Sequence, residues 1–382
     1  MTPQQRRLAA GLFVVAWGTN VSTPLILRYQ DRLDLSNSAA VAIFSVYVGG
    51  ILLALLFAGR LSDRFGRRPL VLPCTAASAL GSLVMLAGRD SLALLLGGRF
   101  ILGAVSGAML SVGTAWMNEL ATDRSAEQRL RLATTTTVLL YAGFGFGPLT
   151  SAVYESIGPW PLVVPYLIHA AACAAAAVAM ASLPETKSRD PHVSLRPRLG
   201  IPPAARPEFF RVLAPAAIWV FGFPSVSFAL FPIILREAIG GADIILSGVI
   251  GTLTALVVLL ARPIVARIGD PRRAIPVALV MGIGGYVVGT IAFATDAWWL
   301  APVSAIALGT ASGMLMSSGL AITEEIADDE NRGALSSTFY LAAYSGMTMP
   351  LVITGLSNVM STTWALVTVT AAAVVALGAV LA

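Results

Sequence analysis

The chain is poor in the residues that build catalytic and metal centres. Its 382 residues include two cysteines and two histidines, and only 12% of the residues are charged. Cys74 and Cys173 fall inside long apolar stretches, where they indicate neither a disulfide framework nor a metal site. The sequence contains no phosphate-binding loop for ATP and no grouping of side chains typical of an enzyme. We therefore expect no enzymatic activity, no catalytic residue, no metal and no cofactor.

Apolar residues, by contrast, are abundant. They make up 57% of the chain, and the mean hydropathy of +0.80 is too high for a globule that faces water on all sides. A helix of roughly 20 apolar residues crosses the hydrocarbon core of a bilayer, which is about 30 Å thick. The sequence predicts twelve such helices, over residues 8–29, 37–59, 70–88, 91–118, 131–154, 160–183, 209–235, 242–261, 274–295, 298–323, 334–356 and 361–381.

Positive charges are distributed unevenly among the predicted loops. If both termini are cytoplasmic, 20 of the 25 lysines and arginines fall in inside segments and four fall outside, with Arg99 within a span. Cytoplasmic loops retain Lys and Arg during insertion, so we expect a multi-pass protein of the cytoplasmic (cell inner) membrane with both termini inside. The basic residues are dispersed over separate loops, so the net charge of +5 does not indicate nucleic-acid binding.

The two halves of the chain repeat each other. Six predicted spans (residues 1–183) precede a basic, proline-rich stretch (184–207) that is typical of an inter-domain linker, and six follow it (208–382). A shift of about 206 residues aligns Gly103 with Gly309, Gly107 with Gly313, Glu119 with Glu325 and the region of Pro148 with that of Pro350. A duplicated six-helix unit implies a pseudo-two-fold axis and a pathway between the halves. The paired glycines favour close helix packing over a ligand role.

Four motifs resemble those of a known family. The run Gly59-Arg60-Leu61-Ser62-Asp63-Arg64-Phe65-Gly66-Arg67-Arg68 closely resembles the loop between the second and third helices of the major facilitator superfamily. Gly98-Arg99-Phe100 resembles its fourth-helix arginine motif, Gly143-Phe144-Gly145-Phe146-Gly147-Pro148 its antiporter signature, and Leu183-Pro184-Glu185-Thr186-Lys187 the end of its sixth helix. The resemblance implies an all-α membrane protein with that fold: 12 transmembrane helices in two pseudo-symmetric six-helix bundles, which expose a central site to each side in turn.

The resemblance also implies a conformational switch. Asp63 would lie against the start of the eleventh span near Gly333, where backbone donors and the helix dipole attract a carboxylate, while the arginines pair with nearby acids or carbonyls. The other interpretation, that the arginines only set topology, does not explain an aspartate among them. The fifth-helix signature suits a kinked helix packed tightly against a neighbour in the opposite half. The expected switch residues are Gly59, Asp63, Arg64, Gly66, Arg67, Arg68, Gly143, Gly147 and Pro148.

Coupling to protons needs a group that titrates during the cycle. No span is predicted to hold an Asp or Glu at mid-depth, so the candidates are Asp63, Arg99, Glu119 and Glu325. Arg99 lies eight residues inside the fourth span, where a charge costs about 2.5–3.5 kcal/mol. Either a relay or cavity role, as the family motif implies, or a structural pairing would explain that cost. His169 has suitable chemistry, but the sixth helix is peripheral in the family.

A substrate cavity is expected along the central helices. Aromatic and methionine side chains form adaptable, largely apolar pockets that suit a lipophilic solute, although each could equally be core packing. The missing mid-depth carboxylates favour a neutral or anionic substrate over a permanent cation. The candidates are Trp17, Asn20, Tyr47, Tyr141, Trp219, Phe223, Phe228, Met314, Tyr340 and Tyr344.

Three functions are compatible with these features. The sequence favours a secondary active transporter, acting as a monomer, that exports lipophilic small molecules in exchange for protons, as multidrug efflux antiporters do. Uptake or facilitated diffusion of a metabolite such as a sugar or organic acid is an alternative, for which Glu185 and the pattern from Glu325 to Gly333 give some support. A non-transporting membrane receptor or assembly factor would be expected to carry an added soluble domain or a long tail.

Overall fold

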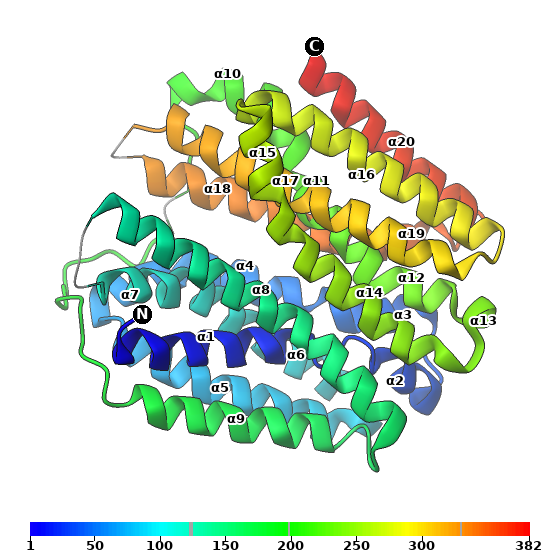
Figure 1. Ribbon diagram of the computed structural model, residues 1–382, viewed down its shortest axis with the longest axis horizontal. Coiled ribbons are helices and arrows are strands. Elements are labelled where there is room, and N and C mark those ends of the chain that lie inside the picture. Colours follow the sequence, from blue (N-terminus) through cyan, green and yellow to red (C-terminus); the bar gives the residue numbers. More distant parts are fainter. Residues whose placement is uncertain (122–124, 198, 329–330) are drawn as a thin grey trace. The chain divides into compact units, whose positions relative to one another are not determined.

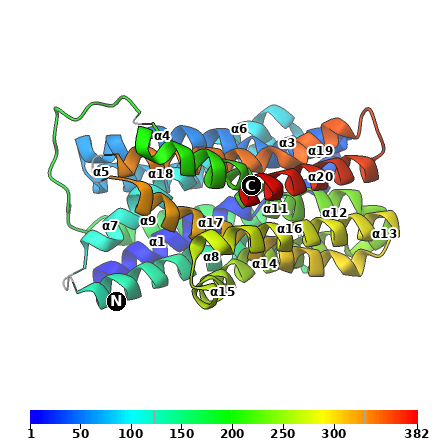
Figure 2. The same ribbon diagram turned by 90° about the horizontal axis from the view of Figure 1, so that it is seen from above.

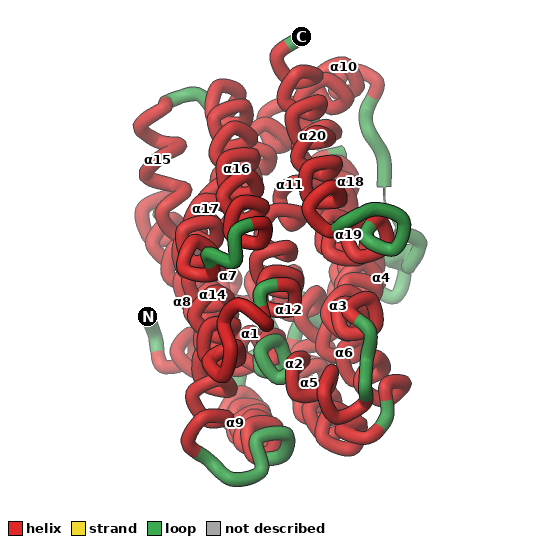
Figure 3. Tube along the Cα trace, turned by 90° about the vertical axis from the view of Figure 1, so that its right-hand side faces the viewer, coloured by secondary structure: helices red, strands yellow, loops and turns green. Residues whose placement is uncertain are grey.

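The protein is built from helices. A computed structural model describes residues 1–121, 125–197, 199–328 and 331–382, and within these ranges there is no strand. Figure 3 shows the helices joined by short loops, apart from the linker after α9. Arg124 and Arg198, two of the basic residues counted for topology, lie outside the described residues.

The described part of the first half contains nine α-helices. They are α1 (Pro3–Asn20), α2 (Ile26–Leu33), α3 (Asn37–Ser45), α4 (Tyr47–Phe65), α5 (Arg68–Ala87), α6 (Leu92–Ala108), α7 (Thr114–Glu119), α8 (Ala126–Ile157) and α9 (Val164–Met180). The second half continues with α10 (Arg206–Glu208), α11 (Ala214–Ser225), α12 (Phe231–Ile234), α13 (Arg236–Ile239), α14 (Asp243–Val257), α15 (Ala261–Ile268), α16 (Pro271–Ala294), α17 (Ala301–Ile326), α18 (Arg332–Ser345), α19 (Met349–Leu356) and α20 (Thr362–Leu381).

The predicted membrane spans are confirmed as helices. Among the described residues, ten helical segments are long and apolar enough to cross a membrane, and α9 is a shorter apolar helix. With α1, they correspond to the twelve predicted spans. The first span differs in its limits: α1 begins at Pro3, because Thr2 and Gln5 form a reciprocal cap, and it ends at Asn20 instead of continuing to residue 29.

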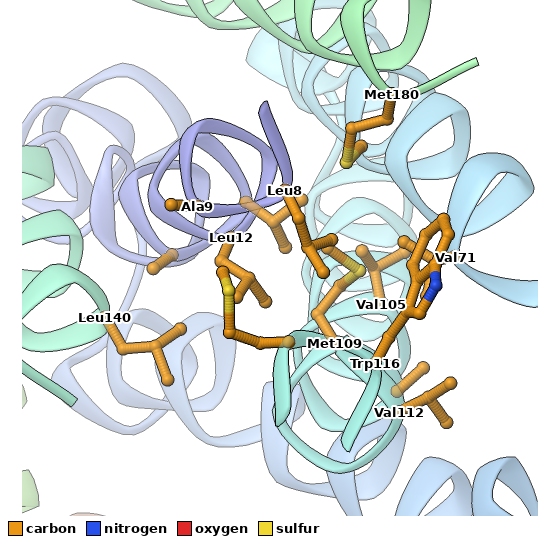
Figure 4. Close-up of a cluster of buried hydrophobic side chains, with 14 of the residues drawn as sticks. Leu8, Ala9, Leu12, Val71, Val105, Met109, Val112, Trp116, Leu140 and Met180 are labelled. Atoms are coloured by element: carbon orange, nitrogen blue, oxygen red, sulfur yellow. The ribbon is translucent and has the colours of Figure 1, made fainter. Parts of the chain in front are cut away.

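One compact unit consists of Met1–Leu33 and Val46–Pro197. In it α4 packs on α6, α5 packs on α6 and α9, and α1 runs alongside α8 and α9 (Figure 1). Its apolar core gathers side chains of α1, α6 and α7, including Leu8, Leu12, Met109 and Trp116, and Met180 of α9 closes it from another side (Figure 4). Burial of this core fixes the helices that carry the charged residues at their ends.

The other compact unit consists of Asp34–Ser45 and Arg198–Ala382. Here α17 packs on α11, α14 and α16, and α16 lies alongside α20 (Figure 2). The second predicted span is divided at Val46: α3 packs on α19, with Ser45 Oγ 3.5 Å from Met347 O, whereas α4 belongs to the first unit. The predicted domain boundaries at residues 183 and 208 remain a prediction.

The glycine pairs of the repeat are sites of close helix packing. A Cβ on Gly107 would come within 2.8 Å of Ala54 on α4, and one on Gly313 within 2.7 Å of Ala261 on α15. A side chain at either position would push the helices apart. The same contact therefore occurs once in each half.

Candidate functional site

The loop between α4 and α5 requires glycine at one position. Gly66 ends α4 with φ of +103°, a conformation that favours glycine, and its N–H donates to Ser62 O. A Cβ on Gly66 would also meet the carboxylate of Glu185. No such contact surrounds Gly59, where a Cβ would find nothing within 4 Å, so packing does not explain glycine there.

Glu185 caps the start of α5 from a distant part of the chain. Arg67, which precedes the helix, offers no side-chain cap, so the first backbone donors of α5 need another acceptor. The Glu185 carboxylate accepts from the N–H of Arg67 at 2.9 Å and of Arg68 at 3.0 Å, and also from the N–H groups of Thr186 and Lys187. A negative charge at a helix N-terminus is favourable, so this carboxylate joins the linker to the loop.

Arg67 is the buried centre of a network in the first unit, and the carboxylate that it pairs with, Glu119, is partly exposed. Its Nη2 lies 2.7 Å from Glu119 Oε1 at the end of α7, and its Nη1 donates to Ser62 Oγ at 2.7 Å. The Thr186 hydroxyl donates to the other Glu119 oxygen at 2.5 Å. Only 8% of Arg67 is exposed, so these contacts are made where water competes little. The network joins α4, α5, α7 and the linker.

The remaining residues of the loop signature are less constrained. Asp63 lies 3.5 Å from Arg67 Nη1 and 3.6 Å from Lys187 Nζ and is half exposed. Arg64 places its guanidinium 5.6 Å from the centre of the Phe65 ring, and Arg68 is exposed. The predicted contact between Asp63 and the region of Gly333 would join the two units, and it remains a prediction.

The second unit contains a related network around Arg272. Nη1 of Arg272 lies 2.8 Å from Glu325 Oε2, and its Nε lies 2.6 Å from Glu208 Oε1. Asp270 caps α16 by accepting from Arg272 N at 2.8 Å, just after Gly269 ends α15 with φ of +80°. Glu325 therefore pairs with an arginine at the start of the ninth span, as Glu119 does with Arg67 at the start of the third.

Arg99 and Tyr47, predicted for different roles, lie together in the first unit. Arg99 is fully buried, and its Nη1 donates to Thr19 O at 2.5 Å and to Ser22 Oγ at 3.2 Å. Its guanidinium stands 4.8 Å from the centre of the Tyr47 ring, a cation–π geometry. These contacts tie α6 to α1 and α4. They offset the cost of a charge within the span, and both a relay role and a structural role for Arg99 are compatible with them.

The fifth-helix signature packs on α1. A Cβ on Gly143 would lie 2.6 Å from Phe13 O, and one on Gly147 would lie 2.5 Å from Trp17 O. The expectation that this signature contacts the opposite half is therefore wrong for these two glycines, because their close neighbour α1 belongs to the same half. Trp17 adds a bond from its Nε1 to Thr150 Oγ1 at 3.2 Å.

Asn20 satisfies a carbonyl that Pro148 leaves without its helical donor. Proline has no N–H, so in α8 the carbonyl of Phe144, four residues earlier, loses its usual partner. Nδ2 of Asn20 donates to this oxygen at 3.1 Å. The second unit has a related arrangement: Pro350 cannot donate to Gly346 O, which accepts from the Met349 N–H instead, and the Ser225 hydroxyl lies 3.3 Å from the same oxygen. Asn20 thus has a structural partner, and substrate contact remains a prediction.

Most of the predicted cavity residues pack against other side chains of their own unit. Trp219 and Phe223 of α11 are buried beside Tyr286, and Met314 is buried on α17. The ring of Tyr344 stacks on Phe221 at a centroid distance of 4.2 Å and on the half-buried Tyr340 at 6.4 Å. Phe228 stacks with Phe44, and Tyr141 contacts Phe144 edge-on. The half-buried members, Tyr141, Phe228 and Tyr340, have surface left for a ligand.

Comparison with known proteins decides the family. The sequence model of the Major Facilitator Superfamily matches residues 8–349. The chain belongs to the major facilitator superfamily. It is therefore a membrane transporter of that family and not a member of an enzyme family.

Similar proteins of this superfamily include drug transporters. The chain is 30% identical over 174 residues to the multidrug resistance protein MdtL of Shigella flexneri serotype 5b (strain 8401), which is 45% of this chain and 42% of the relative. MdtL of Escherichia coli O9:H4 (strain HS) matches with the same identity and coverage. The matched region thus spans less than half the length of these relatives.

Solved structures show the same fold. A POT family transporter in complex with a thioalcohol-conjugated peptide matches with a TM-score of 0.79 and 13% identity, covering 98% of this chain and 94% of that one. The human organic anion transporter MFSD10 (TETRAN) matches with a TM-score of 0.69 and 17% identity over the whole of both chains. At these identities the likeness shows the fold alone.

Sequence reasoning missed several members of the networks in this superfamily protein. Glu208 was not singled out, although an acid between the basic linker and the seventh span was a usable signal. Ser62 and Thr186 were quoted only as parts of motifs, and nothing local in the sequence indicates that their hydroxyls meet Arg67 and Glu119. His169 is buried between Ser82 Oγ at 2.7 Å and Val14 O at 3.0 Å, which ties α9 to α5 and α1.

Proposed function

We propose that this superfamily transporter exports lipophilic small molecules across the cytoplasmic membrane in exchange for protons, by alternating access and as a monomer, with both termini in the cytoplasm. The observation that carries the proposal is the match to multidrug resistance proteins, because it is the most specific functional likeness of the chain. The match covers 42% of those relatives, so the substrate class is inferred from them together with the side chains present here.

The side chains support a lipophilic substrate. Stacked rings of α11 and α18 and the half-buried Tyr141 and Phe228 offer flat apolar surfaces with few polar groups. Such surfaces bind apolar and aromatic solutes by contact area and place little demand on their polar groups. Sugars, which need many hydrogen-bonding partners, fit such surfaces less well. The proposed substrate is therefore a neutral or anionic lipophilic molecule.

Glu119 is the group best placed to link protonation to conformation. Its carboxylate holds both Arg67 and Thr186, so addition of a proton removes the charge that pairs with Arg67. The loop between α4 and α5 and the linker would then be held only through Glu185 and Asp63. In the proposed cycle, protonation of Glu119 loosens this end of the first unit and its deprotonation re-forms the network. Asp63, Arg99 and Glu325 remain further candidates for coupling.

Transport into everted membrane vesicles tests the proposal. Vesicles that contain the protein should accumulate a lipophilic fluorescent dye when the interior is made acidic, and a protonophore should abolish the accumulation. Glu119→Gln should retain dye binding and lose the dependence on the pH gradient. If no lipophilic compound moves with the gradient while a sugar or an organic acid is taken up by cells, the chain is an importer and the export proposal is wrong.

A further inference from the structure

A small cavity opens at the start of α5, beside the Arg67 network. It has a volume of about 370 Å³ and is lined by Arg68, Pro69, Leu72, Pro73, Glu185 and Arg189. Four of these residues are in the first turn and a half of α5, and the other two come from the linker after α9. Two segments more than a hundred residues apart in the sequence thus form one concave surface.

The two arginines of the cavity have no ion-pair partner in the part of the protein that the structure describes. Arg68 and Arg189 are exposed, and within the described ranges neither side chain makes an ion pair or a hydrogen bond. The acid in the lining, Glu185, is already engaged, because its two oxygens accept from four backbone N–H groups. Two guanidinium groups therefore remain available to one anion, and guanidinium forks match phosphate oxygens geometrically.

The apolar part of the lining lies where a membrane helix begins. The segment Arg68–Asp90 is a candidate membrane span, and most of its apolar stretch is not buried in the protein. Leu80 and Leu83, further along α5, are exposed and would face lipid. A site at the first turn of such a helix lies at the depth of lipid headgroups, with acyl chains running along the helix below it.

Proline adds a hydrogen-bond acceptor to the cavity. Pro73 has no N–H and cannot donate to the carbonyl of Pro69, four residues earlier in α5. Both residues line the cavity, so this carbonyl is a candidate acceptor for a ligand hydroxyl. A headgroup with a phosphate for the arginines and a hydroxyl for this carbonyl would satisfy both features.

We propose that the cavity binds the headgroup of an anionic phospholipid from the surrounding leaflet. The phosphate lies between Arg68 and Arg189, a headgroup hydroxyl meets the Pro69 carbonyl, and the acyl chains follow Leu72 and Pro73 along α5. Because Arg189 is in the linker and Arg68 adjoins Arg67, the bound lipid fastens the linker beside the Arg67 network. The proposal is independent of substrate and direction of transport.

Lipid titration of the purified protein tests this site. The full-length protein is titrated in detergent with phosphatidylglycerol or phosphatidylcholine, and binding is followed by native mass spectrometry and by the rise in melting temperature. Wild type should bind phosphatidylglycerol with about thirtyfold preference, since each of the two arginines contributes about 1 kcal/mol to anionic lipid binding. Arg189→Gln should lose most of that preference, and Arg68→Gln/Arg189→Gln all of it.

Two controls make the outcome decisive. Arg211→Gln removes another exposed arginine next to a membrane span and should leave the preference unchanged. Inorganic phosphate at millimolar concentration should not reproduce the stabilisation. If the double variant keeps the wild-type preference, or if phosphate alone stabilises the protein as well as the lipid does, the lipid site is refuted. Melting temperatures in phosphatidylcholine show whether each variant is folded.

Discussion

The two units differ in the contacts that hold the start of one membrane helix to the end of another. In the first unit the side chain of Arg67 is 10% exposed and is surrounded by Ser62, Glu119 and the linker residues that follow α9. In the second unit the side chain of Arg272 is 36% exposed, and its partners are two carboxylates, Glu208 and Glu325.

Burial decides how much each network contributes to stability. Removing one partner of a buried ion pair leaves a charge that has lost both water and its counter-ion, whereas exposed pairs contribute little because water and salt replace them. The linker covers the first network and leaves the second open. The first is thus the more rigid element, and the second can dissociate at low cost.

The largest effect is expected for Arg67→Gln. This change leaves Glu119 without its cation and Ser62 Oγ without its donor, and it should lower the free energy of unfolding by about 2–3 kcal/mol. The midpoint of chemical denaturation in detergent measures it, and dye transport in vesicles should fall in parallel. A wild-type midpoint in this variant would show that the buried network is not a stabilising element.

Glu185→Gln should have an intermediate effect. The amide keeps one acceptor oxygen, but its NH2 group faces a backbone donor, so at least one charge-assisted bond at the start of α5 is lost, at a cost of about 1–2 kcal/mol. The matched change in the second unit is Glu208→Gln, which keeps an acceptor oxygen for Arg272 Nε and removes the charge from this one bond to a half-exposed arginine. Equal denaturation midpoints for the two variants would remove the distinction between the covered and the open network.

The proline-linked carbonyls extend the comparison to the helix middles. Asn20→Leu should destabilise the protein by about 1 kcal/mol, and Pro148→Ala should suppress that loss, because residue 148 can then donate to Phe144 O. A double-mutant cycle on denaturation midpoints measures the coupling. The cycle of Ser225→Ala with Pro350→Ala should give a weaker coupling, since the Ser225 hydroxyl also lies 3.0 Å from Gly222 O. Stronger coupling in the second unit would contradict this order.

The smallest effect is expected for Arg272→Gln. The side chain of Arg272 is 36% exposed and that of Glu325 is 60% exposed, so salt can screen this pair. The denaturation midpoint should therefore move much less than for Arg67→Gln, and moderate salt should remove the remaining difference from wild type. A shift as large as that of the Arg67 variant would mean that exposure does not set the difference between the two networks.

The sequence predicts the framework well because hydropathy and motifs are local properties. The spans follow from runs of apolar residues, and the repeat that aligns Glu119 with Glu325 correctly indicated two acids in comparable places. The partners were harder to predict. Glu185 caps a helix 117 residues earlier in the chain, and α3 packs on α19. Both contacts depend on tertiary packing, which the periodicity of the sequence does not predict.

Asn20 shows where this limit lies. The sequence indicates that the Asn20 amide needs a partner in the membrane. It also indicates that Pro148 leaves the carbonyl of residue 144 without its helical donor. The donor and the acceptor of this hydrogen bond could thus both be named from the sequence. The sequence did not show that α1 and α8 are neighbours, which the close approach of Gly143 and Gly147 to the α1 backbone establishes.

The hydrogen bonds between Glu185 and the loop before α5 determine where the polypeptide could be cut so that each fragment keeps its own contacts. Every member of the Arg67 network, through Lys187, precedes Asp190, and Gly200 bonds to Thr338 in the second unit. A break between Asp190 and Pro197 would leave each fragment with its own set of ion pairs. A break a few residues earlier, between Leu183 and Glu185, would leave Glu185 on the C-terminal fragment, whereas α5, which Glu185 caps, would be on the N-terminal fragment.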